Sequence, residues 1–110
     1  MKTSGLGIDI VETRRIKKAS SKKFLIKVYS KKELDSCLKS ANKYERLAAR
    51  FAAKEAVIKA LNKKNIPLNK IEILNELSGK PTVKIRGEKK KLLISISHCK
   101  DYACAVCLAF

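Results

Sequence analysis

The chain has 110 residues, of which 45% are hydrophobic and 33% charged, and it contains only four glycines and two prolines. This length is enough for one domain with a single hydrophobic core, and the composition excludes intrinsically disordered and collagen-like classes. We therefore expect one globular domain over residues 1–110.

The charge of the chain is strongly positive. Lysine and arginine number 26 against 10 acidic residues, which gives a formal charge of +16 at pH 7. Such a charge predicts a polyanionic partner, which includes nucleic acid, an acidic protein, a phosphorylated cofactor and a lipid surface. A lysine-rich composition on a solvated surface would give the same total without a specific partner, so charge alone does not choose among these interpretations.

No window of the sequence approaches the roughly 20 apolar residues of a membrane-spanning helix, and the N-terminal MKTSGLGIDIVE lacks the apolar run of a signal peptide. We therefore expect a cytosolic protein with four free thiols, at Cys37, Cys99, Cys104 and Cys107. The C-x-x-C spacing of the last two is also found in zinc and redox centres. They lie in the apolar run YACAVCLAF, however, where residues three apart on a strand point to opposite faces, and this favours structural cysteines.

The N-terminal part is expected to hold a strand followed by helices. Residues 4–12 alternate as a short strand, with Asp9 on the face opposite to three large apolar residues, Leu6, Ile8 and Ile10. The next stretch, ETRRIKK, has a helical and basic pattern that ends at two serines. Ser30 is a plausible N-cap for KKELDSCLKS, because Glu33 occupies the capping-box position three residues later.

The clearest predicted element is a helix from about Lys43 to Asn62. One apolar stripe follows it at helical spacings, made by Leu47, Phe51, Ile58 and Leu61. Glu55 falls at the edge of that stripe, one turn before Lys59 and beside a strip of small residues, Ala48, Ala52 and Ala56. Because alanine is compact, this flank would let another chain segment or a ligand come close. An ordinary surface pair of Glu and Lys, worth only about a few tenths of a kcal/mol, would show the same spacing.

After the loop NKKNIPLN, turn signals separate four strand candidates: KIEILNE, PTVKIRG, LLISISH and YACAVCLAF. A strand, then helices, then an antiparallel meander predicts the α+β class.

Two carboxylates, Asp9 and Glu55, lie where the patterns predict apolar surroundings. A carboxylate in such a place must be paired or must bind a cation, and two acids with no cysteine or second histidine nearby suit Mg²⁺ better than zinc. Mn²⁺ would fit the same oxygen ligands. Magnesium usually takes phosphate oxygens as further ligands, so we expect a phosphorylated substrate whose charge is met by Arg50, Lys54 and Lys59.

His98 is the only histidine in the chain and follows Ser97 at the end of LLISISH. A lone histidine at a strand end is more often structural than catalytic. The sequence contains no glycine-rich phosphate loop of the GxxxxGK[ST] type.

Four segments, in this order and spacing, resemble those of holo-acyl-carrier-protein synthase, the small single-domain type of 4′-phosphopantetheinyl transferase: GLGIDIVE, RFAAKEAVIKAL, SGKP and ISISHCKDYACAV. The similarity spans essentially the whole chain, and G-x-D-x-x-E together with F-A-A-K-E-A is specific. The resemblance implies Mg-dependent transfer of the 4′-phosphopantetheine arm from coenzyme A to a serine of apo acyl carrier protein, with release of adenosine 3′,5′-bisphosphate. This activity serves fatty acid biosynthesis.

The resemblance also implies roles for individual residues. Asp9 and Glu55 match the residues that hold Mg²⁺, and Lys59 matches a lysine that contacts phosphate; these three form the implied catalytic set. Contacts to coenzyme A are expected from a larger group, with His98 as a phosphate ligand and not a base: Arg50, Lys54, Lys59, Gly79, Lys80, Pro81, Ser97 and His98. The turn after the long helix, LNKKNIP, lacks the family's glycine, and Lys63 and Lys64 would offer charge there instead.

Members of this family are similar in being homotrimers whose active sites lie between subunits, with segments 78–81 and 97–98 coming from the neighbouring chain. The basic residues expected to dock the acidic helix of the carrier protein are Arg15, Lys18, Lys23 and Lys27.

Two other functions fit part of the sequence. A small nucleic-acid-binding protein would use the positive charge along a phosphate backbone, but the chain has only three phenylalanines and three tyrosines, forms no basic-aromatic patch, and would leave Asp9 and Glu55 without a role. An inactive scaffold relative would bind the carrier protein without modifying it. We expect neither nucleic acid nor a membrane as the partner.

Overall fold

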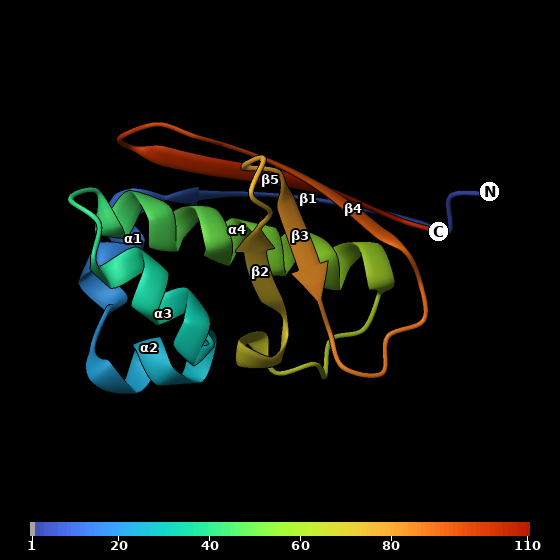
Figure 1. Ribbon diagram of the computed structural model, residues 1–110, viewed down its shortest axis with the longest axis horizontal. Coiled ribbons are helices and arrows are strands. Elements are labelled where there is room, and N and C mark those ends of the chain that lie inside the picture. Colours follow the sequence, from blue (N-terminus) through green and yellow to red (C-terminus); the bar gives the residue numbers. More distant parts are fainter. Residues whose placement is uncertain (1) are drawn as a thin grey trace.

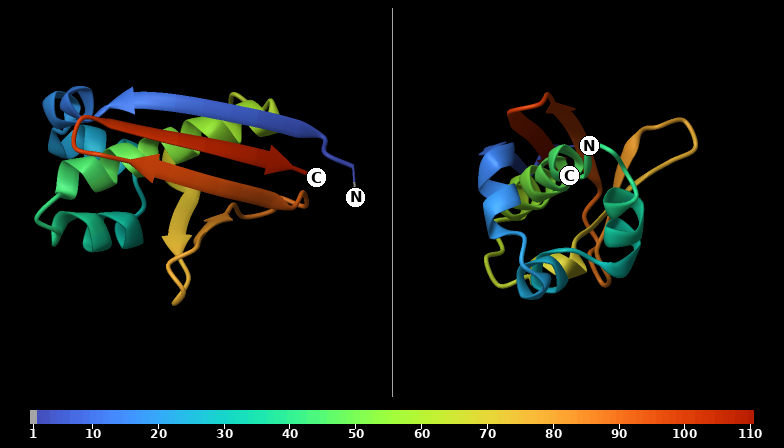
Figure 2. Two further views of the ribbon diagram at one scale, coloured as in Figure 1. Left: turned by 90° about the horizontal axis from the view of Figure 1, so that it is seen from above. Right: turned by 90° about the vertical axis from the view of Figure 1, so that its left-hand side faces the viewer.

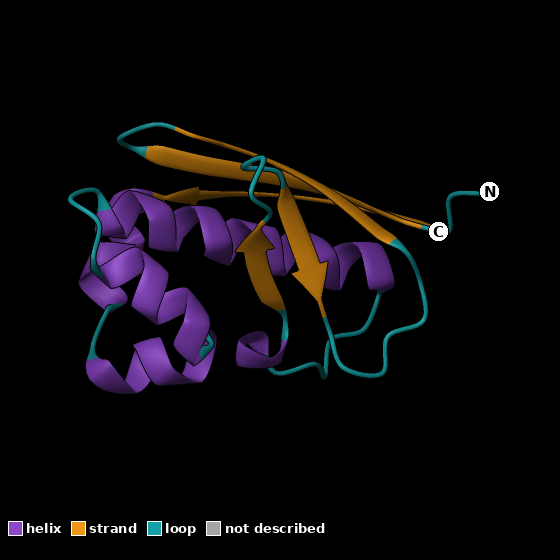
Figure 3. Ribbon diagram, in the orientation of Figure 1, coloured by secondary structure: helices purple, strands orange, loops and turns teal. Residues whose placement is uncertain are grey.

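The structure is a computed structural model that describes residues 2–110, and it places a sheet along the length of one long helix (Figure 1). The helices are α1 (Thr13–Ala19), α2 (Lys22–Val28), α3 (Lys31–Leu38) and α4 (Lys43–Leu61), with a short 3-10 helix at Leu68–Lys70. The strands are β1 (Gly5–Glu12), β2 (Glu72–Asn75), β3 (Pro81–Lys84), β4 (Leu92–His98) and β5 (Tyr102–Ala109). The predicted α+β class is confirmed (Figure 3).

The strands are antiparallel, as predicted, but they divide between two sheets. Strand β5 lies between β1 and β4 in one sheet, and β2 pairs only with β3 in a separate hairpin (Figure 2). The expectation of one continuous meander is therefore wrong between β3 and β4. The edge of β4 away from β5 has no strand neighbour within residues 2–110, and the β2 backbone is tied to α3 instead, through the N–H of Ile73, which donates to Glu33 Oε2 at 2.9 Å.

The sheet approaches α4 closely because both contact surfaces consist of very small residues. A Cβ atom on Gly7 would lie 1.9 Å from the backbone oxygen of Ala56, and one on Gly5 would lie 1.8 Å from that of Ala60. Ala56 is completely buried. The alanine strip that was predicted to admit another chain segment therefore admits β1, and this contact places Asp9, two residues after Gly7, beside the helix.

Three local predictions are confirmed: the capping box, the limits of the long helix and the opposite orientation of the two strand cysteines. The Ser30 hydroxyl accepts from the N–H of Glu33 at 3.2 Å, and the Glu33 carboxylate accepts from the N–H of Ser30 at 2.8 Å, which is the predicted capping box. The predicted long helix ends within one residue of its expected limit. Cys107 faces the core and Cys104 the opposite side, as the strand pattern indicated.

The turn after α4 needs no glycine because Asn62 adopts the left-handed conformation, with φ of 54°. Asparagine tolerates this region better than most residues. Lys63, expected to offer free charge here, instead forms a 2.9 Å ion pair with Glu88.

The face of the sheet that points away from α4 is apolar and open to solvent. Leu6, Ile8 and Ile10 are 63%, 60% and 67% exposed. In the strand register Ile8 stands opposite Val106, and Leu6 and Leu93 flank Leu108, so the apolar surface crosses all three strands. We call these residues the outer apolar face. None of the helices within residues 2–110 combines the length and the apolar character that crossing a bilayer requires.

Candidate active site

Asp9 and Glu55, which lie on β1 and α4, line the same cavity. Its volume is about 370 Å³, and its remaining walls are mostly apolar, made by Ile10, Val11, Arg15, Ile16, Ala19, Phe24 and Phe51. Asp9 reaches the cavity because it shares the helix-facing side of β1 with Gly7, and Glu55 lies one residue before Ala56. The structure thus brings together the two acids that the sequence predicted to converge.

The charges in this cavity favour a bound cation. Burial raises the pKa of Glu55, the negative charge of Asp9 raises it further, and Lys59 opposes both effects. Lys59 Nζ donates to the backbone oxygen of Ile8 at 2.8 Å and lies 3.4 Å from Asp9 Oδ1, with a half-exposed side chain. Two carboxylates therefore share one partly solvated ammonium group, and the pair can bind a cation although the exposed Arg15 also lines the cavity.

The donor set suits a metal that keeps water or substrate oxygens as ligands. Across residues 2–110 the structure contains no cluster of three or more His, Cys, Asp or Glu side chains arranged to hold a metal ion. A structural zinc site would need such a cluster. Mg²⁺ is commonly held by one or two carboxylates together with phosphate oxygens and waters, so Asp9 and Glu55 fit it.

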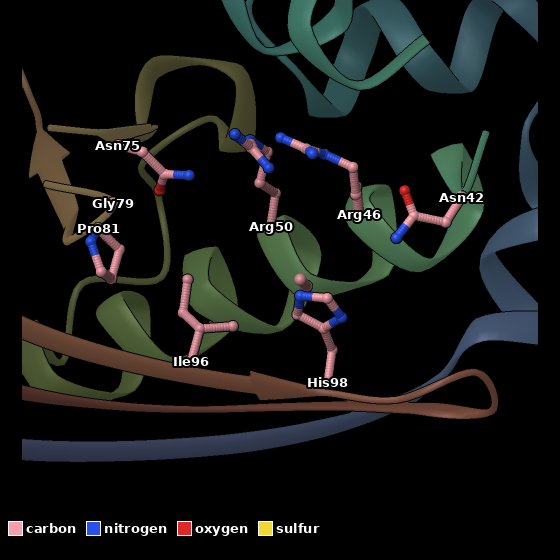
Figure 4. Close-up of a pocket in the computed structure, with 9 residues that line it drawn as sticks. Asn42, Arg46, Arg50, Asn75, Gly79, Pro81, Ile96 and His98 are labelled. Atoms are coloured by element: carbon pink, nitrogen blue, oxygen red, sulfur yellow. The ribbon is translucent and has the colours of Figure 1, made fainter. Parts of the chain in front are cut away.

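A second cavity, of about 210 Å³, lies where α4 meets the β2–β3 turn and the end of β4 (Figure 4). It is lined by Asn42, Arg46, Ala49, Arg50, Asn75, Gly79, Pro81, Ile96 and His98. Figure 4 shows the side chains of Arg46 and Arg50 extending toward one another. Arg50 is 6% exposed, and the Nε atoms of both arginines are buried without a hydrogen-bond partner. Buried donors of this kind are normally satisfied, so the cavity is suited to an anion.

Lys54 does not contact this or the first cavity, and the prediction that it binds phosphate is wrong. Its side chain is fully buried, and its Nζ donates to Glu33 Oε1 at 2.6 Å, to the backbone oxygen of Leu68 at 2.9 Å and to that of Ile71. These three bonds use all three ammonium hydrogens. The reason is helical geometry, because Lys54 lies about 100° around the helix from Glu55 and therefore points into the core.

The other predicted coenzyme A ligands separate into groups. Gly79, Pro81 and His98 lie together with Arg50 in the second cavity, whereas Lys59 lies at the first. The closeness of Arg50 to Glu55 in the sequence suggested that the two side chains lie together. In the structure they lie at different cavities. Lys80 and Ser97 are exposed and line neither cavity, so their contacts to coenzyme A stay predictions.

The predicted carrier-docking residues are all exposed, on α1 and α2. Arg15 lines the cavity that holds Asp9 and Glu55, and Lys18 lies on the same helix. Lys23 and Lys27 lie on α2. A positive surface therefore borders the first cavity.

The sequence analysis did not predict several residues that lie in or beside the second cavity. Arg46 could have been found, because it precedes Arg50 by one helical turn and so shares its side of α4. Asn42 and Asn75 carry no local signal. Neither does Glu45, whose Oε1 lies 2.7 Å from Nδ1 of His98.

Comparison with known proteins agrees with this geometry. The profile of the 4′-phosphopantetheinyl transferase superfamily matches residues 5–107. The holo-[acyl-carrier-protein] synthase of Thermodesulfovibrio yellowstonii is 52% identical over 105 residues, which cover 92% of this chain and 93% of that protein.

Two solved structures share the fold. The crystal structure of a holo-(acyl-carrier-protein) synthase from Bacillus anthracis in complex with CoA (3′,5′-ADP) is 33% identical, with a TM-score of 0.88, covering 97% of this chain and 96% of that one. That of Helicobacter pylori holo-[acyl-carrier-protein] synthase in complex with coenzyme A is 32% identical, with a TM-score of 0.85, covering 96% and 99%. On this evidence the chain belongs to the 4′-phosphopantetheinyl transferase superfamily, as a member of its holo-[acyl-carrier-protein] synthase family.

Proposed function

We propose that this enzyme transfers the 4′-phosphopantetheine group from coenzyme A to a serine of apo acyl carrier protein, in a Mg-dependent reaction that releases adenosine 3′,5′-bisphosphate. The observation that carries the proposal is the pair of Asp9 and Glu55 in one cavity beside Lys59. The names of the relatives and the coenzyme A complexes of the two solved structures support it. The cytosolic location and the role in fatty acid biosynthesis stay predictions.

The residues of the first cavity would act by position and charge. Asp9 and Glu55 would hold Mg²⁺, which when bound neutralises charge on the pyrophosphate of coenzyme A. Lys59 is held near Asp9 by the backbone oxygen of Ile8, so its ammonium group is placed to meet charge that develops on the leaving bisphosphate. The apolar walls, including Phe24 and Phe51, would exclude water from the reacting groups.

The second cavity would bind the adenosine bisphosphate end of coenzyme A. Two of its lining residues, Arg46 and Arg50, have buried Nε donors that a phosphate oxygen would satisfy. The Gly79–Pro81 turn would contribute backbone, because Gly79, at φ of 90°, has no side chain to block an approach.

Mass spectrometry of apo acyl carrier protein incubated with enzyme, coenzyme A and Mg²⁺ tests the function. We expect a gain of one phosphopantetheine mass that disappears when a chelator removes the metal. Binding of the carrier without any gain would support a scaffold protein instead. A gel-shift with nucleic acid, strong and independent of Mg²⁺, would support the nucleic-acid-binding alternative.

We further propose that the enzyme is a homotrimer with its active sites between subunits. Within one chain the two cavities share no lining residue. A coenzyme A molecule that contacts both is most simply placed between two copies, where the first cavity of one copy meets the second cavity of its neighbour. The outer apolar face offers a surface for such an assembly, because exposed patches that cross several strands usually mark interfaces.

Ile8→Lys should convert the assembly into monomers, because it places a charge in the centre of the outer apolar face. Light scattering after size-exclusion chromatography measures the mass. Ile26→Lys is the matched control, since Ile26 is 56% exposed on α2, outside this face, and its replacement should leave the mass unchanged. A trimer that persists in Ile8→Lys would contradict the proposed interface.

Binding of Mg²⁺ should weaken on acidification at a higher pH than the ordinary titration of a glutamate. The pKa of Glu55 is raised, and only its ionised form is a ligand, so protons compete with the metal earlier than at a normal carboxyl. Without metal, the pH dependence of stability has the opposite sign: a raised folded-state pKa favours the protonated form of Glu55 in the fold, so its ionisation lowers the free energy of unfolding as the pH rises. Calorimetric Mg²⁺ titrations with coenzyme A present, repeated at several pH values, measure the midpoint. A midpoint in the normal glutamate range would contradict this prediction.

Charge reversal at Lys18 and Lys23 should raise the KM for the carrier protein and leave the KM for coenzyme A unchanged. Both side chains are exposed on α1 and α2, outside the two cavities, and the carrier is acidic in the proposed function. Steady-state kinetics in low and high salt measure the effect, which should shrink as salt screens the charges. Equal changes in both KM values would argue against a docking role.

A further inference from the structure

His98 stands at the edge of the second cavity with one ring nitrogen already engaged. It ends β4, its side chain is 38% exposed, and its Nδ1 lies 2.7 Å from Oε1 of Glu45, in the first turn of α4. Glu45 is 53 positions away in the sequence and its side chain is 21% exposed. Figure 4 shows the imidazole on the strand side of the cavity, across from the helix that carries Arg46 and Arg50.

The chemistry of the pair fixes which nitrogen carries hydrogen. An ionised carboxylate only accepts hydrogen bonds, so at 2.7 Å the Nδ1 atom must be the donor. A free neutral imidazole in water favours the other tautomer, with hydrogen on Nε2. The contact with Glu45 therefore selects the less common form of the neutral ring. When the ring takes a second proton, that proton is added at Nε2, which then becomes a donor to a different partner while Nδ1 stays with Glu45.

The surroundings of the ring indicate what that partner is. From α4 the side chains of Arg46 and Arg50 line the same cavity, and no carboxylate is among its lining residues. Glu45 itself faces a neighbouring groove, whose charged lining residues are Arg14, Lys17, Lys18, Lys43, Lys100 and Asp101. Positive charge thus dominates both sides of the ring, so the Nε2 atom faces a space suited to an anion.

We propose that Glu45 is a positioning residue for His98: its carboxylate holds the Nδ1 hydrogen and fixes the plane of the ring, so that the ring, once it takes a second proton, donates its Nε2 hydrogen to an anionic group bound beside Arg46 and Arg50. This rests on the proposed function for the identity of that group, which is then a phosphate of coenzyme A.

The tautomer can be observed directly because the chain has a single histidine. We expect ¹⁵N NMR of the labelled enzyme, at a pH where the ring is neutral, to show hydrogen on Nδ1. Glu45→Ala should return the ring to the Nε2 form, while Glu45→Gln, whose carbonyl still accepts, should keep the Nδ1 form. Hydrogen on Nε2 in the unmodified enzyme, or no change in Glu45→Ala, would overturn the proposal. This measurement needs no substrate, so its outcome is independent of the proposed transferase activity.

Binding supplies the second readout. Glu45→Ala should weaken the binding of adenosine 3′,5′-bisphosphate roughly tenfold, the lower end of the usual cost of losing an orienting partner. Glu45→Gln should recover most of this binding, and in Glu45→Ala the KM for coenzyme A should rise by a larger factor than the KM for the carrier. Asp35→Ala removes the same charge from an exposed position on α3 and serves as the control. Equal weakening in Glu45→Gln and Glu45→Ala, or in Asp35→Ala, would show a general charge effect and overturn the positioning role.

Discussion

Glu55→Gln should lower kcat/KM for phosphopantetheine transfer by at least about a hundredfold, the usual result of removing one group that stabilises transition-state charge. The amide has nearly the shape of the carboxylate but no charge, so the cavity would keep its form while losing half of its metal-binding charge. Glu55 is only half-buried and has no hydrogen-bonded partner to lose within residues 2–110, so the fold should be unaffected.

Adenosine 3′,5′-bisphosphate binding is the internal control for this variant. The second cavity shares no residue with the first, so Glu55→Gln should bind the nucleotide as the unmodified enzyme does in the absence of Mg²⁺. Mass spectrometry over time gives the rate. Transfer at the normal rate would remove Glu55 from the proposed metal site.

Lys54→Met should lower the free energy of unfolding by about 3–5 kcal/mol, the cost of breaking a buried ion pair by removing one partner. The substitution leaves Glu33 buried without its cation and two backbone oxygens without a donor. Burial lowers the pKa of Lys54 while the Glu33 charge opposes the shift, so the pair depends on both members being present. Urea unfolding measures the effect.

Lys59→Met is the matched control, because Lys59 lies on the same helix but is half-exposed and 3.4 Å from its acid. A pair of this kind contributes at most about 1 kcal/mol. The two variants should therefore show opposite profiles: Lys54→Met loses stability, whereas Lys59→Met loses transfer activity. Similar stability of both would contradict the structural role assigned to Lys54.

The sequence predicts features that depend on one element at a time. The capping box of Ser30 and Glu33 and the limits of α4 follow from spacings within a few residues. The meeting of Asp9 with Glu55 could be predicted because each acid interrupts an apolar pattern. A carboxylate in apolar surroundings must be paired or must bind a cation.

Other features that depend on which elements meet could not be predicted from the sequence. Nothing near Lys54 indicates that Glu33, 21 positions earlier, will meet it in the core, so its neighbours Arg50 and Lys59 suggested a shared phosphate site. Lys59 in fact lies beside Asp9, whereas Arg50 lines the second cavity and Lys54, one turn later on the same side of the helix, is bound to Glu33 in the core. The separation of the β2–β3 hairpin from the main sheet has the same origin, because the hydrogen bond that ties β2 to α3 joins Ile73 to Glu33, 40 positions apart.

The contact between Gly7 and Ala56 has a consequence for how the enzyme tolerates change. Main-chain atoms alone set the separation of the strand that carries Asp9 from the helix that carries Glu55, since no side chain intervenes. Side chains elsewhere in the interior can repack after substitution, but two backbones already in contact cannot close further. Most interior mutations should therefore leave the distance between the two acids unchanged. A methyl group added at Gly7 would change it, because it would collide with the helix backbone.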